Sequence, residues 1–264
     1  MIRGNRVRAI GAILFCVIST SLPATEATVV GDQLILSGRA SDNELVLVRD
    51  AIAKHGDRIK VVILRDHSGR AENTDLMRAA DLIAERGWRT AVSGFCGTAC
   101  SKLFLGGVER HFTDDKSTSQ TSVMFGSTTF VKDSDSVKTD RSRRGGEGSE
   151  RHNFLMRQWT QARTGGKVSE ATLNRMFPPD GEIRYLHFYD AKRVTRKDGV
   201  SVLFCDGKEA PAKRWQECEK IADTDAYKDG ILTSGVLIRS NDRQDAKPGG
   251  SEGAVAPTPP VPAK

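Results

Sequence analysis

Apolar residues in the first half of the chain alternate between a strand pattern and a helix pattern. Residues 60–66 (KVVILRD) form a continuous β-branched run, which is typical of strands buried on both faces of a parallel sheet. In residues 75–87 (DLMRAADLIAERG) the apolar positions recur at helical spacing, and Gly87 ends the run. Residues 88–92 (WRTAV) return to a strand pattern. This order predicts a β-loop-α-β unit with a right-handed crossover.

The same two patterns continue on both sides of this unit. Residues 29–37 predict two strands joined at Gly31-Asp32, and residues 44–56 predict a helix capped by Ser41 or Asp42. The polar residues 66–74 predict a turn between strand and helix. Further strands are expected at 122–130, 183–190 and within 200–238, and a short strand or turn at 109–112. Further helices are expected at 152–164 and, capped by Ser169, at 168–177. The expected fold class is therefore α/β, with a mostly parallel sheet flanked by helices.

One stretch, residues 93–107 (SGFCGTACSKLFLGG), joins a predicted strand to a predicted helix. The chain turns through Gly94 and Gly97 and starts a helix at about Thr98. A helix start collects unpaired N–H groups and partial positive charge, so it suits an anion or the oxyanion of an acyl-transfer reaction. The simpler interpretation is a buried, glycine-rich turn held by a disulfide.

The first 27 residues have the three parts of a secretory signal peptide. Arg3, Arg6 and Arg8 precede an apolar segment, and small residues place the cleavage site after Ala27. The apolar segment is shorter than the about 20 residues of a membrane-spanning helix. We therefore expect a periplasmic or secreted protein without stable membrane insertion after cleavage; the alternative is an uncleaved N-terminal anchor.

Cleavage removes Cys16 and changes the meaning of the remaining cysteines. In an oxidising compartment an even number of cysteines indicates disulfides. Closeness in sequence favours the pairs Cys96–Cys100 and Cys205–Cys218. The spacings do not form the paired knuckles of a zinc site, so we expect no metal. A redox role for Cys96 and Cys100 is the alternative, since a thiol at a helix N-terminus can have a lowered pKa.

Charge and composition exclude some partners and mark the irregular segments. The formal net charge is +6, and no basic stripe is interleaved with aromatic residues, so we expect no nucleic-acid partner. Residues 132–151 are polar and charged, which predicts a mobile loop. Residues 241–264 are rich in Pro, Gly and Ala, which predicts a disordered tail.

The motif order resembles a known family. The strand 60–66, a glycine turn, a helix and the strand 88–92 are followed by G-x-C-x-T-A-C (94–100) and LFLGGVER (103–110). This order resembles the Clp protease proteolytic subunit within the Clp/crotonase superfamily. It is similar, more narrowly, to periplasmic Clp-protease-like proteins with a C-x-S-A-C element followed by LFLAG-x-x-R. The resemblance covers roughly residues 31–199 and is sharpest over residues 93–110.

The resemblance implies a domain organisation and a site. It implies a layered Clp/crotonase-like ββα-repeat domain at 28–199. The strand pattern and the Cys205–Cys218 pair separately predict a disulfide-tied β extension at 200–240. The nucleophile position of the family falls on Thr98, and the oxyanion-hole N–H groups fall on Gly69, Arg70 and Ala99. The general-base histidine position falls on Gly126. The acid falls nearest Ile183, with Asp180 and Glu182 as open alternatives.

These positions depart from the family pattern at the reacting groups. Threonine replaces serine and glycine replaces histidine, and a hydroxyl nucleophile is weak without a base. Loss of one triad member costs several orders of magnitude in rate. A surviving hydrolase would need a substitute base, for which the sequence offers His67, His111, His152 and His187.

The departures predict a Clp-protease-like domain that is catalytically inactive and binds a protein or peptide partner, with no cofactor. The alternative is a serine-protease-like hydrolase that uses Thr98 as nucleophile with a displaced base. Clp subunits assemble into rings, so a homo-oligomer stays open as a further expectation.

Overall fold

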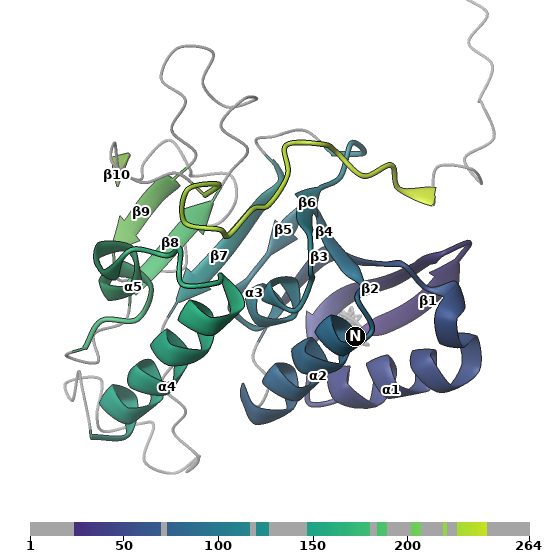
Figure 1. Ribbon diagram of the computed structural model, residues 1–264, viewed down its shortest axis with the longest axis horizontal. Helices are drawn as coiled ribbons and strands as arrows, with labels where there is room; N and C mark the ends of the chain where they lie inside the picture. The colour runs from purple at the N-terminus through teal and green to yellow at the C-terminus, as the bar shows by residue number, and fades with distance from the viewer. Residues whose placement is uncertain are drawn as a thin grey trace, which may run out of the picture.

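A computed structural model describes residues 24–69, 73–116, 120–126, 147–179, 184–188, 202–206, 219–220 and 226–241. The chain forms two five-stranded sheets with helices packed beside them (Figure 1). The first sheet has the strand order β1-β2-β3-β4-β6, and the second has the order β10-β9-β8-β7-β5. The α/β fold class predicted from the sequence is confirmed.

The first sheet is parallel except at its β1 edge. Strands β2, β3, β4 and β6 run parallel, and β1 pairs antiparallel with β2. In β3 the β-branched run is fully buried, because the sheet is covered on both faces. The strands are β1 (Glu26–Val30), β2 (Gln33–Ala40), β3 (Val61–Gly69), β4 (Arg89–Ser93) and β6 (Arg110–Phe112).

Different elements cover the two faces of the first sheet. The helices α1 (Glu44–His55), α2 (Asn73–Glu85) and α3 (Thr98–Leu105) pack on one face through the main hydrophobic core. The short 3-10 helix η1 (Gly56–Arg58) follows α1. On the other face Ile238, from the C-terminal segment 226–241, packs on Ile35, Val61, Ile63 and Ala91. Figure 1 shows this segment in yellow beside β6.

The second sheet starts at the turn that carries Thr98. Its strands are β5 (Phe95–Cys96), β7 (Ser122–Gly126), β8 (Arg184–Phe188), β9 (Val202–Asp206) and β10 (Glu219–Lys220). Strands β5 and β7 are parallel and the other pairs are antiparallel. The helices α4 (Glu147–Arg163) and α5 (Glu170–Met176) follow β7. Phe125 and Phe188 pack edge to face at 5.6 Å in this sheet.

Most predicted elements are present, with three corrections to their ends. Strand β3 continues to Gly69, through residues where a turn was predicted, because its end pairs with Arg39 and Ala40 of β2. The helix cap is not Ser41 or Asp42: Asn43 precedes α1, and the Glu44 carboxylate accepts the Ser41 N–H at 2.7 Å. Helix α4 begins at Glu147, so the end of the predicted loop 132–151 is helical.

Some predictions fall at or beyond the limits of the described residues. Residues 1–23, 127–146 and 242–264 lie outside them. The predicted cleavage after Ala27 falls inside β1, and strands β8 and β9 pair across the predicted boundary at 199. Cys218 lies outside the described residues, so the Cys205–Cys218 pairing stays a prediction. Within the described part of the chain, no helix has the length and apolarity needed to cross a bilayer.

The last residue of the LFLGGVER motif anchors the C-terminal segment. Arg110 is 5% exposed, and its guanidinium donates to the carbonyls of Gly107 (2.7 Å), Gly230 (2.6 Å) and Ile231 (3.0 Å). Burial lowers the pKa of Arg110 to about 10. The Arg110 N–H donates to the Thr233 hydroxyl at 2.7 Å. The motif arginine therefore holds the segment that covers the sheet.

Arg110→Met is expected to lower the free energy of unfolding by about 3 kcal/mol, because three carbonyl oxygens lose a charged donor. Urea unfolding at pH 7 measures the change, and hydrogen exchange at Thr233 and Ile238 should accelerate first. The matched control is Arg86→Met, since the ion pair of Arg86 with Asp57 is exposed and such pairs contribute about 0–1 kcal/mol. Equal losses in the two variants would contradict the anchor.

Candidate functional site

The site lies where the chain passes from the first sheet to the second. After β4, Gly94 takes a left-handed conformation (φ +82°), and a Cβ there would collide with the Asp66 carboxylate. Asp66 also accepts the Phe95 N–H at 3.1 Å. The Gly97 N–H then donates to the His67 carbonyl at 3.0 Å, and α3 begins at Thr98 as predicted. The end of β3 therefore fixes both sides of the turn.

A disulfide closes the turn around Thr98. Cys96 and Cys100 are bonded, with their Cα atoms 5.2 Å apart, and both are fully buried. Cys96 belongs to β5 and lies before the helix, which brings the two residues within disulfide reach. The predicted Cys96–Cys100 pairing is confirmed.

Thr98 makes hydrogen bonds through its side-chain hydroxyl and through its backbone carbonyl. Its hydroxyl donates to the Gly69 carbonyl at 3.2 Å, and the residue is 7% exposed. Its own carbonyl accepts from the Ser101 hydroxyl (2.8 Å) and from Lys102 Nζ (3.3 Å). The end of β3 thus presents a carbonyl oxygen to the hydroxyl, whereas an oxyanion requires donors.

The other positions of the expected oxyanion hole are partly visible. Ala99 is the second residue of α3 and is buried, so its N–H belongs to the helix start. The N-cap residue Gly97 contributes no side-chain cap. Arg70 lies outside the described residues, as do Asp180, Glu182 and Ile183. The oxyanion roles of Gly69, Arg70 and Ala99 therefore stay predictions.

Two of the candidate histidines have partners other than the Thr98 hydroxyl. His67 is fully buried beside Glu44, with Nε2 3.6 Å from a carboxylate oxygen. His111 contacts the Val236 carbonyl (2.9 Å) and Glu109 (3.3 Å) on the side of the C-terminal segment. The His187 side chain lies outside the described residues. In the parts of the chain that the structure describes, no imidazole is within hydrogen-bond distance of the Thr98 hydroxyl.

Among the candidates whose side chains the structure describes, His152 is the one whose pKa is affected by a residue of α3. It lies on α4, and burial lowers its pKa to about 4, with the charge of Lys102 contributing further. A histidine with this pKa is neutral above about pH 4. Gly126, at the expected base position, is the last residue of β7 and pairs with Tyr185.

Lys102 is a residue that the sequence reasoning missed. It lies one turn after Thr98 and is 4% exposed, and burial alone lowers its pKa to about 8. Among the described residues, no carboxylate is within ion-pair distance of its amine. The sequence offered one signal, because Lys102 is the single cation in the residues that form α3. The structure shows that all eight residues of this helix are buried. Lys102 is therefore a second buried polar group at this turn, besides the Thr98 hydroxyl.

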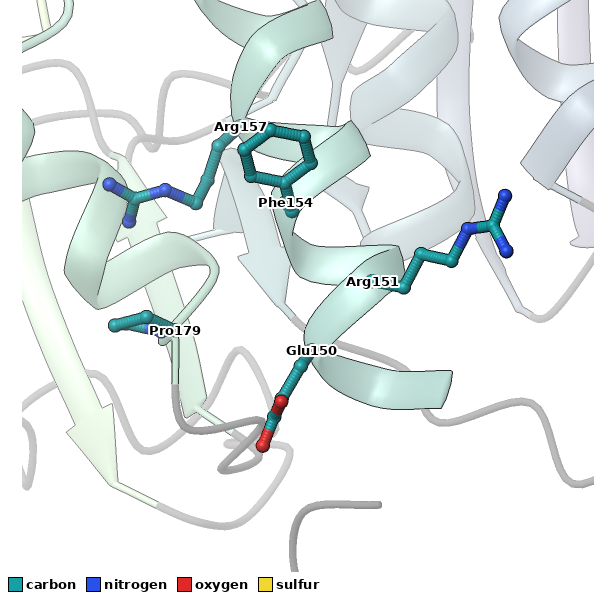
Figure 2. A pocket seen from close by; sticks show the side chains of 5 residues that line it. All are labelled: Glu150, Arg151, Phe154, Arg157 and Pro179. Atoms are coloured by element: carbon teal, nitrogen blue, oxygen red, sulfur yellow. The ribbon is translucent and has the colours of Figure 1, made fainter. Parts of the chain in front are cut away.

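A surface hollow of about 340 Å³ lies along α4, at some remove from these contacts. Its lining includes Phe154 and Arg157, and Figure 2 shows the Phe154 ring next to Arg157, with Pro179 across the hollow. Phe154 is 57% exposed and its neighbour Leu155 is 50% exposed. Arg157 is held by Glu170 and Asn174. The remaining lining residues are Glu150 and Arg151.

Comparison with known proteins finds similar structures but no significant match of the sequence. No protein-family model matches the sequence, and no curated protein matches it significantly. A protein described as an enoyl-CoA hydratase/isomerase from Acinetobacter baumannii is 10% identical, with a TM-score of 0.37, over 82% of this chain and 75% of that chain. ThnE from S. clavuligerus is 12% identical, with a TM-score of 0.35, over 80% and 75%. The α/β architecture stated above rests on the strand order itself.

Lys102→Met is expected to stabilise the protein at pH 7. The pKa falls from 10.5 to about 8 on folding, so burial of the ammonium costs up to about 3 kcal/mol. Below pH 8 both states are protonated and the full cost is present. Between pH 8 and 10.5 the unfolded chain binds more protons, so the stability of the unmodified protein rises with pH. The advantage of the methionine variant should therefore shrink across that window.

Urea unfolding between pH 7 and 10.5 measures this difference. The control is Lys54→Met, because Lys54 is 68% exposed and pairs only with Asp50 on the surface among the described residues. Its effect should be small and independent of pH. A methionine variant at position 102 that is less stable than the parent at pH 7 would contradict the uncompensated burial.

Replacing both Cys96 and Cys100 by alanine is expected to lower the free energy of unfolding by about 2 kcal/mol, since the bond closes a short loop. Urea unfolding of oxidised protein and double variant measures the loss. The native protein should resist mild reductant, because both sulfur-bearing residues are fully buried. Rapid reduction of the folded protein would favour the redox interpretation instead.

Proposed function

We propose that this chain is a secreted or periplasmic Clp-protease-like domain on a crotonase-type scaffold, and that it binds a protein or peptide partner without cleaving it. The observation that carries the proposal is the hydrogen bond from the Thr98 hydroxyl to the Gly69 carbonyl. A backbone carbonyl can accept this hydrogen bond but cannot remove the proton. In this conformation the hydrogen bond therefore does not activate the hydroxyl.

Two further features support a site that does not turn over peptide bonds. Gly126 offers no side chain at the expected base position, and the imidazoles described lie elsewhere. Hydrolysis of an amide also needs a group that protonates the leaving nitrogen. His152, with a pKa of about 4, carries no proton to give at neutral pH.

The hollow on α4 supports a peptide or protein partner. Exposed large apolar side chains next to each other mark interaction surfaces, and aromatic residues and arginine are enriched at such interfaces. Here Phe154 and Leu155 are exposed beside Arg151 and Arg157. The proposal assigns to this surface a peptide segment with an apolar side chain.

Display of a random peptide library to the protein lacking residues 1–23 tests this function. Peptides should be enriched, and Phe154→Glu should abolish their binding, because a charge replaces the exposed ring. The matched control is Val46→Glu, since Val46 is 53% exposed on α1, away from the hollow. Absence of enrichment, or equal loss in both variants, would refute the binding surface.

The same protein should show no turnover of casein or fluorogenic peptides at pH 7. The alternative function, a hydrolase with Thr98 as nucleophile and a displaced base, predicts turnover that Thr98→Ala abolishes. Such turnover would replace the proposed function by the hydrolase, whatever the outcome of the peptide display.

A further inference from the structure

Lys102 is the buried titratable group that the proposed function does not use. It lies four residues after Thr98, and side chains at this spacing lie one above the other on a helix. A helical side chain also leans toward the preceding turn. The structure shows this lean: Lys102 Nζ reaches the Thr98 carbonyl at 3.3 Å. The amine therefore lies at the backbone carbonyl of the residue that carries the hydroxyl.

The surroundings of this amine set it apart from a structural lysine. All eight residues of α3 are buried, and the described residues place no carboxylate within ion-pair distance of Lys102. Among the described residues, His152 on α4 is a titratable group whose pKa the charge of Lys102 lowers, and burial accounts for the shift at Lys102 itself. A lysine buried in this way shifts its pKa toward neutrality, which makes it a general base.

Proton transfer from the Thr98 hydroxyl to Lys102 requires a second conformation of the hydroxyl. In helices the threonine side chain divides between two rotamers, because its oxygen has alternative hydrogen-bond partners. Rotation about Cα–Cβ takes Thr98 Oγ1 away from the Gly69 carbonyl. Catalytic contacts are often long in a structure without substrate and shorten once substrate binds.

We infer that Lys102 is the base of a latent hydroxyl–amine pair, and that Thr98 is a nucleophile toward small activated esters. The neutral amine of Lys102 takes the proton of the Thr98 hydroxyl as Oγ1 attacks the acyl carbon. The ester C–O bond breaks, its alkoxide or phenolate leaves with the bond electrons, and Thr98 becomes O-acylated. The resulting ammonium releases its proton to solvent, so atoms and charge balance.

This activity goes beyond the proposed function and agrees with it. Burial places the pKa of Lys102 at about 8, so the amine is mostly protonated at pH 7 and mostly neutral above pH 9. An activated ester has a leaving group that needs no proton, whereas a peptide bond does. The pair therefore acylates at alkaline pH without becoming a peptidase at neutral pH.

The test uses p-nitrophenyl acetate with the protein lacking residues 1–23, between pH 6.5 and 10. The small acetyl group suits a residue that is only 7% exposed. A stoichiometric burst of p-nitrophenol is expected, with a rate that rises with pH to a midpoint near 8. Mass spectrometry should place the acetyl group on Thr98, and Thr98→Ala should abolish the burst.

Two substitutions at position 102 distinguish a role of Lys102 as a base from a purely structural role. Lys102→Met removes the base, and Lys102→Arg keeps the positive charge without a neutral form near pH 8. Both should slow the burst about 100-fold, while Lys54→Met, at an exposed lysine on α1 that pairs with Asp50, should not. Circular dichroism and the melting temperature establish that each variant is folded; a misfolded Lys102→Arg leaves the decision to Lys102→Met.

Three outcomes would overturn the inference. They are acetylation of Lys102 or of exposed lysines instead of Thr98, a burst that persists in Lys102→Met, and a rate that does not depend on pH between 7 and 9. Peptide binding measured with Phe154→Glu is independent of these variants. Failure of the pair and failure of the proposed function are therefore distinguishable.

Discussion

The passage of the chain from one sheet to the other at Gly94 determines where every group of the candidate site lies. The left-handed backbone of Gly94 leaves room for Asp66, whose carboxylate accepts the first N–H of β5. The Gly94 carbonyl accepts the Ser122 N–H at 3.0 Å, so the same residue joins the second sheet to the first. With the turn fixed on both sides, α3 can start only at the end of β3, and this places Thr98 against Gly69.

The two buried cations that follow this turn differ in the number of carbonyls that accept from them. Arg110 has a planar group with several donors, and three carbonyls meet it, so its burial ties the C-terminal segment to the sheet. Lys102 donates to one carbonyl at 3.3 Å, and burial lowers its pKa to about 8, into the range where a neutral amine forms. A satisfied cation stabilises the fold, whereas an unsatisfied one becomes available for proton transfer.

The parts of the fold that follow from local pattern could be predicted from the sequence. The β-branched run gives β3, helical spacing gives α1 and α2, and the start of α3 at Thr98 follows from the glycines before it. The second sheet could not be predicted, because β5 has only two residues and its partners come from distant segments. The burial of Lys102 was also hidden, since it depends on the packing of α3 against α2, β3 and β7.

The hydrogen bond of the Thr98 hydroxyl is linked to the protonation state of Lys102. While the amine is protonated, it donates to the Thr98 carbonyl and cannot accept a proton, and the hydroxyl finds its acceptor at Gly69. Deprotonation removes the charge that burial opposes and creates a lone pair one helical turn from the hydroxyl. Proton affinity at Lys102, set by packing, therefore decides whether the turn is only a rigid junction between two sheets or also a nucleophile.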